Sequence, residues 1–225
     1  MSSDFESWDP VWETVFRENE WGKYPEASLI QFIARNFYNK KERNKVSLLE
    51  VGCGPGANIW FMAREGFNVT GIDGSETAIK RAKERLSNES LNAKLIAGDI
   101  IKLPFKALEF DAVIDNECLY ANNKTNSLSI LSEINGVLKK DGLFYSRTFS
   151  NNMFVGKRMM KDDFEFSNIT EGPLSGKGFV RLMDEQQINN IYGKYFDIIS
   201  VDKLEYTQYN GKELISEFII ICKKK

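Results

Sequence analysis

The stretch from Glu50 to Gly56 combines a carboxylate with three glycines at alternate positions, which suits the binding of a nucleotide-like ligand. The apolar run 46–51 is short, rich in valine and leucine, and bounded by turn residues, so it predicts a buried strand. Residues 57–65 follow with a helical apolar pattern. Glycines between a strand and a helix let the backbone approach a ligand closely and aim helix N–H groups at it. The alternative is a tight strand-to-helix turn that binds nothing.

A second acidic residue, Asp73, ends the apolar segment 68–72, which we predict to be the next strand. In an open parallel sheet, ligands bind at the carboxyl ends of the strands, and an acidic side chain there can hold both hydroxyls of a ribose. The spacing therefore predicts one site shared by two strands.

A third group of polar side chains follows segment 110–115, which we predict to be the fourth strand. Because the chain has no histidine, His-based triads and His-ligated metal sites are excluded, and no metal site is expected. A general base must then be a carboxylate, tyrosine, lysine or cysteine. The catalytic candidates are Asp115, Asn116, Glu117 and Tyr120. Capping of the loop is the alternative role for each of them.

These ordered motifs resemble those of the class I S-adenosylmethionine-dependent methyltransferases. The resemblance covers roughly residues 46–149 and rests on Glu50 to Gly56, on Asp73, on Ala97 to Ile100, and on Leu103 to Phe105. Nicotinamide-binding Rossmann enzymes are the nearest alternative. They usually carry Gly-x-Gly-x-x-Gly, whereas here the third glycine comes one residue earlier and a proline lies inside the loop.

The resemblance implies S-adenosylmethionine as the cofactor and S-adenosylhomocysteine as its product. In the family, the matches to the glycine loop face the methionine part, the match to Asp73 binds ribose, and the matches to Asp99 and Ile100 hold adenine. Residues after the fourth strand line the methyl-transfer site, where donor and acceptor are held in line. The cofactor-binding residues expected on this basis are Trp21, Glu50, Gly52, Cys53, Gly54, Asp73, Gly74, Asp99, Ile100 and Asn116.

We expect the acceptor to be a small molecule that is methylated on oxygen or nitrogen. A protein or RNA methyltransferase and a catalytically silent protein of the same fold are the alternatives. The chain lacks an Asn/Asp-Pro-Pro-Tyr/Phe motif after the fourth strand and a Pro-Cys nucleophile, which argues against DNA as a partner. The net charge of −2 offers no electrostatic footprint for long nucleic acid. No run approaches the ~18 apolar residues of a membrane span, so we expect a cytoplasmic protein. We expect it to be a monomer or a homodimer.

Residues 1–40 are rich in aromatic side chains and contain two predicted helices, which begin near Asp9-Pro10 and at Pro25. One interpretation is that the aromatic residues only pack these helices onto the sheet. The other is a lid, centred on Trp21 to Pro25, that closes over cofactor and acceptor with Tyr24 at the acceptor.

Segment 150–180 departs from the family pattern and is predicted to be a substrate insertion. It holds the cations Lys157, Arg158 and Lys161, among others. Arg181 follows just after it, and Arg147 lies on the preceding strand. We therefore expect an acceptor with a carboxylate or phosphate that binds Arg147 or Arg181. The alternative is local neutralisation of the cations by Asp162, Asp163 and Glu165.

The predicted fold is a single α/β domain over residues 1–225. It is Rossmann-like, with a seven-stranded, mostly parallel sheet, an antiparallel last strand and an N-terminal helical lid. A helix over 127–138, a strand over 143–149, and a terminal hairpin turning at Asn210-Gly211 complete the pattern. The four parts are the lid 1–40, the cofactor-binding core 46–149, the insertion 150–180, and the helix and hairpin 181–225.

Overall fold

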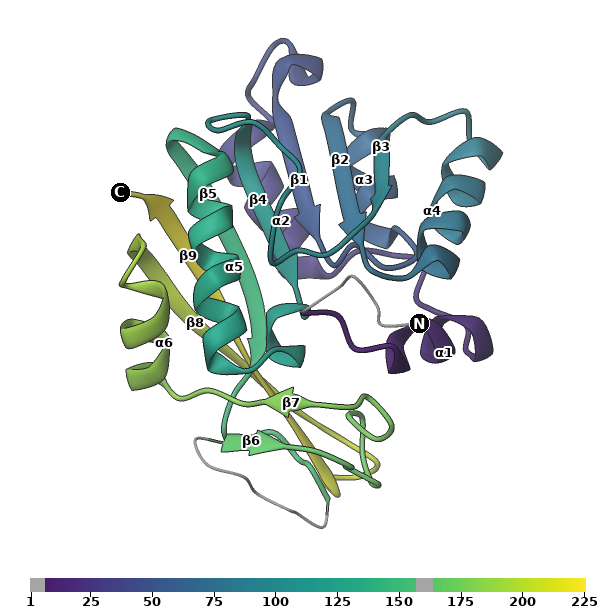
Figure 1. The fold of residues 1–225 in the computed structure, drawn as a ribbon, viewed down its shortest axis with the longest axis vertical. Helices are drawn as coiled ribbons and strands as arrows, with labels where there is room; N and C mark the ends of the chain where they lie inside the picture. Colours follow the sequence, from purple (N-terminus) through teal and green to yellow (C-terminus); the bar gives the residue numbers. More distant parts are fainter. Residues whose placement is uncertain (1–6, 157–163) are drawn as a thin grey trace.

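The computed structural model describes residues 7–156 and 164–225, and its centre is one seven-stranded sheet (Figure 1). The strand order is β3-β2-β1-β4-β5-β9-β8. β1 to β5 run parallel, whereas β9 is antiparallel to both β5 and β8. The strands are β1 (Ser47–Val51), β2 (Asn68–Asp73), β3 (Lys94–Ala97), β4 (Phe110–Asn116), β5 (Leu138–Phe149), β8 (Phe196–Gln208) and β9 (Glu213–Lys224). This confirms the predicted sheet and its antiparallel last strand.

Helices cover both faces of the sheet (Figure 1). On one face α2 (Ala27–Phe37), α3 (Ala57–Arg64) and α4 (Glu76–Asn88) bury Leu29, Met62 and Ile79 in a core shared with β1. On the other face α5 (Lys124–Val137) and α6 (Glu185–Tyr192) bury Ile134 and Ile188 in a core shared with β4 and β5. The 3₁₀ turns are η1 (Arg43–Lys45) and η2 (Leu119–Ala121).

The central strands are apolar on both faces because both faces are covered. Three of them nevertheless carry a buried carboxylate at or near the carboxyl end: Glu50 on β1, Asp73 on β2 and Asp115 on β4. Burial of a carboxylate is costly unless bound groups compensate it. We therefore expect polar ligands to bind at the edge of the sheet where these three residues lie.

A short helix, α1 (Val11–Glu18), lies beside the start of α4 at this edge (Figure 1). The carboxylate of Glu13 accepts hydrogen bonds from the hydroxyls of Ser75 and Thr77, at the N-terminus of α4. Arg81 on α4 donates to the backbone oxygen of Asn19 at 2.9 Å. The N-terminal segment is thus attached to the N-terminal half of α4.

The segment after β5 forms a small layer of its own. β6 (Glu165–Phe166) pairs antiparallel with β7 (Val180–Arg181), and both lie beyond the carboxyl edge of the large sheet (Figure 1). The layer's apolar core includes Phe149, Met153, Phe166, Leu174, Val180 and Ile215. The predicted boundary between residues 180 and 181 therefore cuts a strand. Lys157, Arg158, Lys161, Asp162 and Asp163 lie outside the described residues.

Two predicted boundaries around α5 were wrong. The helix begins at Lys124 because the Asn123 side chain caps it by accepting from the Asn126 N–H at 2.9 Å. It ends at Val137, and β5 starts at once because Leu138 pairs with Phe110. The predicted helix end at Lys139 to Gly142 is therefore strand.

Candidate functional site

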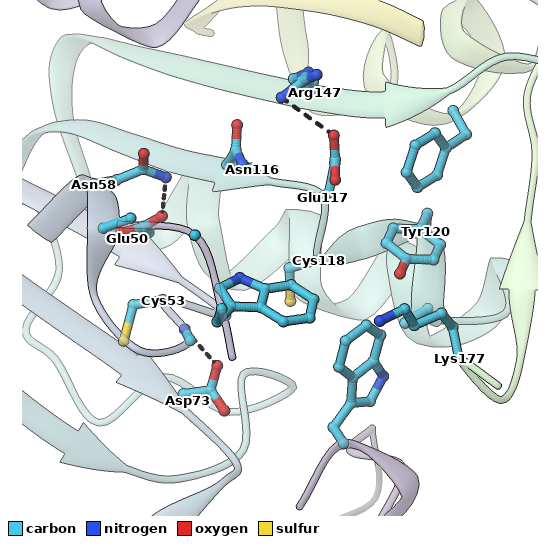
Figure 2. Close-up of a pocket in the computed structure, with 18 of the residues that line it drawn as sticks. Glu50, Cys53, Asn58, Asp73, Asn116, Glu117, Cys118, Tyr120, Arg147 and Lys177 are labelled. Carbon is cyan, nitrogen blue, oxygen red and sulfur yellow. Dashed lines mark hydrogen bonds and ion pairs between the residues drawn. The ribbon is translucent and has the colours of Figure 1, made fainter. Parts of the chain in front are cut away.

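A cavity of about 450 Å³ lies at the carboxyl edge of the sheet. Its walls come from the glycine loop, the ends of the central strands, the N-terminal segment, the insertion and the hairpin (Figure 2). This volume falls in the range of small-molecule sites. The cavity has two ends of different chemistry, one polar around Asp73 and one aromatic around Tyr120.

The glycine loop and the end of β2 form one hydrogen-bonded unit at the polar end. Asp73 accepts from the backbone N–H of Gly54 and of Ser75, both at 2.8 Å. Gly52 has a left-handed φ of 64°, and a Cβ there would lie 2.2 Å from the Cys118 sulfur. No other residue type fits this position without moving Cys118.

Glu50 presents an unused oxygen at this end of the cavity. Asn58 on α3 donates to Glu50 Oε1 at 2.6 Å, while Oε2 is buried with no hydrogen-bond partner among the described residues (Figure 2). Burial raises the pKa of Glu50 to about 8. A cationic or N–H donor ligand would satisfy this oxygen and restore the charged form.

Burial also changes the acidity of the neighbouring groups. The pKa of Asp73 is raised to about 6 by burial, while the N–H donors of Ser75 and Gly54 oppose the shift. Burial raises the pKa of the Cys53 thiol well above its usual range, and the nearby carboxylates add to this effect. The Cys53 thiol is therefore neutral, and we assign it a place in the cavity wall and not the role of a nucleophile.

The residues before α1 complete the polar end. Ser7 donates its backbone N–H to Asp99 at 2.8 Å, and its hydroxyl also bonds this carboxylate. The Trp8 ring packs against Gly74, where an added Cβ would lie 2.2 Å from the ring. The N-terminal segment thus covers the stretch of the cavity between Asp73 and Asp99.

Arg147 on β5 joins three carboxylates at the other end. Its guanidinium bonds Glu217 on β9 through Nη2 at 2.6 Å and through Nε at 3.0 Å. Nη1 lies 3.2 Å from both Glu26, which precedes α2, and Glu117, which follows β4. The positive charge of Arg147 is therefore already balanced by the protein.

Glu117 has an unusual backbone and an unusual acidity. Its φ of 58° is left-handed, and its N–H donates to the Arg147 carbonyl at 2.9 Å. Burial raises the pKa of Glu117 to about 8, with Glu217 and Glu26 adding to the rise and Arg147 opposing it. A strained residue with a shifted pKa in a cavity is typical of a functional group.

Aromatic side chains from distant segments enclose the aromatic end of the cavity. Trp12 on α1 meets the edges of Trp21 and Tyr120 at centroid distances of 6.1 and 6.4 Å. Tyr120 meets Phe149 at 4.8 Å. Tyr24 is 77% exposed, so it stands at the rim of the cavity and not inside it.

Most of the predicted site residues come together on the wall of this one cavity. They are Trp21, Tyr24, Glu50, Gly52, Cys53, Gly54, Asp73, Gly74, Asp99, Ile100, Asn116, Glu117, Tyr120 and Arg147. Their roles in binding or catalysis stay predictions.

Asp115 and Arg181 do not line the cavity, contrary to the prediction. Asp115 is fully buried, accepts from the N–H groups of Cys118 and Leu119 and from the Ser146 hydroxyl, and so holds the turn after β4. Arg181 is 2% exposed and donates to the Asn122 carbonyl and the Ser127 hydroxyl. Neither side chain therefore lies on the wall of this cavity.

Several wall residues were not predicted. Glu217 had a visible signal, since it is a lone carboxylate inside an apolar strand pattern. Lys177 lies between Gly176 and Gly178, which mark a loop in the sequence. The sequence does not show which way the Lys177 side chain points. Ser7, Trp8, Glu26 and Asn58 are further examples.

Two classes of feature are not found in residues 7–156 and 164–225. There is no group of three or more His, Cys, Asp or Glu residues that could hold a metal ion. No helix in these ranges is long and apolar enough to cross a membrane.

Comparison with known proteins gives a family match over most of the chain. Residues 42–208 match the family described as a methyltransferase domain. An uncharacterized methyltransferase of Schizosaccharomyces pombe is 30% identical, over 46% of this chain and 72% of that protein. A demethylmenaquinone methyltransferase of Staphylococcus aureus is 32% identical, over 64% of this chain and 59% of that protein.

Solved structures share the fold over nearly the whole chain. An S-adenosylmethionine-dependent methyltransferase of Methanosarcina mazei has a TM-score of 0.70 at 21% identity, covering 89% of this chain and 98% of that one. A 1,6-didemethyltoxoflavin-N1-methyltransferase of Burkholderia thailandensis, solved with S-adenosylhomocysteine, has a TM-score of 0.61 at 15% identity, covering 88% and 86%. At these identities the likeness concerns the fold alone.

Proposed function

The chain belongs to the class I S-adenosylmethionine-dependent methyltransferases, and from this membership we propose that it methylates an oxygen or nitrogen atom of a small molecule. The observation that carries the proposal is the two-ended cavity, with the family's cofactor motifs at one end and an aromatic chamber at the other. The names of the demethylmenaquinone and didemethyltoxoflavin enzymes support a small acceptor.

The residues at the polar end fit S-adenosylmethionine. The unpartnered Oε2 of Glu50 is a buried acceptor suited to the ammonium or other N–H donors of the methionine part. Asp73 would bind the ribose hydroxyls, while Asp99 and Ile100 would border the adenine. When bound, the cofactor supplies an electrophilic methyl group.

The chain's own residues orient the acceptor, exclude water and supply a proton acceptor. Glu117 is the group we assign as the base, because its carboxyl lines the cavity directly after β4. Arg147 holds one Glu117 oxygen at 3.2 Å and so fixes where the acceptor's proton goes. The rings of Trp12, Trp21 and Tyr120 exclude water from the reacting atoms.

Asn116 is a second polar group for the acceptor. Its Oδ1 is buried with no hydrogen-bond partner among the described residues, and the side chain lines the cavity beside Glu117 (Figure 2). A hydroxyl or amine of the acceptor would donate to it. The base is needed only where the acceptor arrives protonated.

The first experiment is calorimetry with S-adenosylhomocysteine, for which we expect micromolar binding. The second supplies tritium-labelled S-adenosylmethionine and a small-molecule extract, and follows label transfer by wild type and Glu117→Gln. The glutamine variant should bind the cofactor normally and transfer label 10²- to 10⁴-fold more slowly, in line with the usual worth of a general base. Tight NADH binding without S-adenosylhomocysteine binding would instead indicate a nicotinamide enzyme.

A protein or RNA acceptor is the competing function. It requires an open groove, whereas the acceptor end is covered by the N-terminal segment and the insertion. Label appearing in protein or RNA and not in the small-molecule fraction would favour it. Cytoplasmic location and a monomeric or homodimeric state stay predictions.

A further inference from the structure

Lys177 is a cation on the cavity wall that the proposed reaction does not use. It lies in the loop between β6 and β7, and its Nζ is directed into the aromatic end, on the side of Tyr120 (Figure 2). Nζ lies 4.6 Å from the ring centroid of Trp21 and 5.4 Å from that of Trp12. Within residues 7–156 and 164–225 it has no ion pair and no side-chain hydrogen bond.

The two arginines first expected to bind an anion are already engaged. Arg147 is paired with Glu217, and Arg181 donates to Asn122 and Ser127. An incoming anion would have to displace those partners. Lys177 has none to displace, so it is the cavity cation best placed to accept a new charge partner.

The surroundings of Lys177 favour an anion over water. Half-burial lowers the pKa of Lys177, and the charge of Glu117 opposes this effect. The faces of Trp12 and Trp21 stabilise the ammonium, but three N–H donors remain that a ring cannot fully satisfy. A carboxylate can accept hydrogen bonds from these N–H groups, and this charged interaction is stronger in a site that excludes water.

Apart from Arg147 and its carboxylate partners, much of the wall at this end is apolar. Phe149, Met153, Leu174 and Ile215 line it together with the tryptophans. A molecule that fills it needs an apolar, ring-sized body to replace water at these side chains.

We propose that the acceptor is an apolar, ring-containing molecule with a carboxylate or similar oxyanion that binds Lys177, so that its hydroxyl or amine points to Glu117. The inference rests on the proposed methyl transfer and adds the chemical class of the acceptor. It assigns to Lys177 the role predicted from the sequence for Arg147 or Arg181, namely binding of the acceptor's anionic group.

The test uses two fluorescent probes, 6-hydroxy-2-naphthoate and 2-naphthol, which share a ring body and a hydroxyl but differ in the carboxylate. Each is titrated into the full chain saturated with S-adenosylhomocysteine. Wild type should bind the carboxylate probe at least tenfold more tightly than the neutral one. Lys177→Met should abolish that preference, Lys177→Arg should keep most of it, and Lys80→Met, an exposed lysine on α4, should leave it unchanged.

S-adenosylhomocysteine affinity is measured in every variant, which separates this inference from the proposed function. Normal cofactor binding with equal affinity for the two probes, or with no binding of either, overturns the role of Lys177 alone. A preference that survives in Lys177→Met also overturns it. Absence of cofactor binding in wild type would count against the methyltransferase function itself.

Discussion

Gly54 donates its backbone N–H to the carboxylate of Asp73 at 2.8 Å, so the glycine loop is anchored to the residue expected to bind ribose. The second Asp73 oxygen accepts from Ser75 in the same way. One carboxylate therefore shapes the loop and presents its remaining lone pairs to the cavity. A change at Asp73 should disturb both functions together.

We predict that Asp73→Asn weakens S-adenosylhomocysteine binding by about 1.5–3 kcal/mol, roughly ten- to a hundredfold, because charge-assisted hydrogen bonds are lost. Calorimetry measures the dissociation constant. Asp197→Asn, an exposed aspartate on β8, is the matched control and should bind like wild type. An unchanged dissociation constant in a folded Asp73→Asn protein would contradict the ribose role.

Gly52→Ala should destabilise the fold by about 2–3 kcal/mol, since alanine is strained at a φ of 64° and its Cβ would meet the Cys118 sulfur. Thermal or urea unfolding measures the change. Gly136→Ala is the control, because Gly136 lies in α5 with nothing within 4 Å of an added Cβ. It should stabilise the fold by up to about 1 kcal/mol through helix propensity. Equal effects of the two changes would show that the contact with Cys118 does not constrain the loop.

The burial of Glu50 predicts a pH dependence of stability. Its pKa rises from 4.5 to about 8 on folding, so the folded state binds the proton more tightly than the unfolded one. The stabilisation by this proton is full below about pH 4.5 and is lost as the pH rises to about 8. Glu50→Gln lacks this loss, so the variant should gain thermal stability relative to wild type between pH 5 and pH 8. If the melting temperatures of wild type and Glu50→Gln change with pH in the same way across this range, the result would argue against a protonated Glu50.

Cofactor should protect the N-terminal segment. Since Trp8 covers Gly74 and Phe16 packs near Gly54, a ligand beneath them should slow hydrogen exchange in residues 8–38. The hairpin at 196–224 provides the internal comparison, because most of it lies away from the polar end. Exchange measured with and without S-adenosylhomocysteine decides the matter. Equal slowing in both regions would leave these aromatic residues with a packing role.

Much of the fold was predictable because its signals are local. The strands β1, β2 and β3 are short runs closed by Gly52, Asp73 and Gly98. Asn210 and Gly211 both adopt the left-handed backbone that the hairpin turn needs. The polar end was predictable for the same reason, since Glu50 and Asp73 lie at the carboxyl ends of β1 and β2.

The aromatic end of the cavity was less predictable because its contacts join segments that are distant in the sequence. Arg147 is neutralised by Glu26, Glu117 and Glu217, which come from three different parts of the chain, and no local pattern reports such pairing. Arg181 could have been recognised as buried, since apolar residues flank it on both sides. The direction of Lys177 depends on the packing of the insertion against α1, which only the folded chain specifies.

The position of α1 has a kinetic consequence. Phe16 lies near the glycine loop and Trp12, one turn earlier on the same helix, lies under Lys177. We therefore expect a single displacement of this helix to open the polar and aromatic ends at once. Release of both products would then be governed by one shared opening rate, and a substitution that loosens α1 from Ser75 and Thr77 should speed both departures by the same factor.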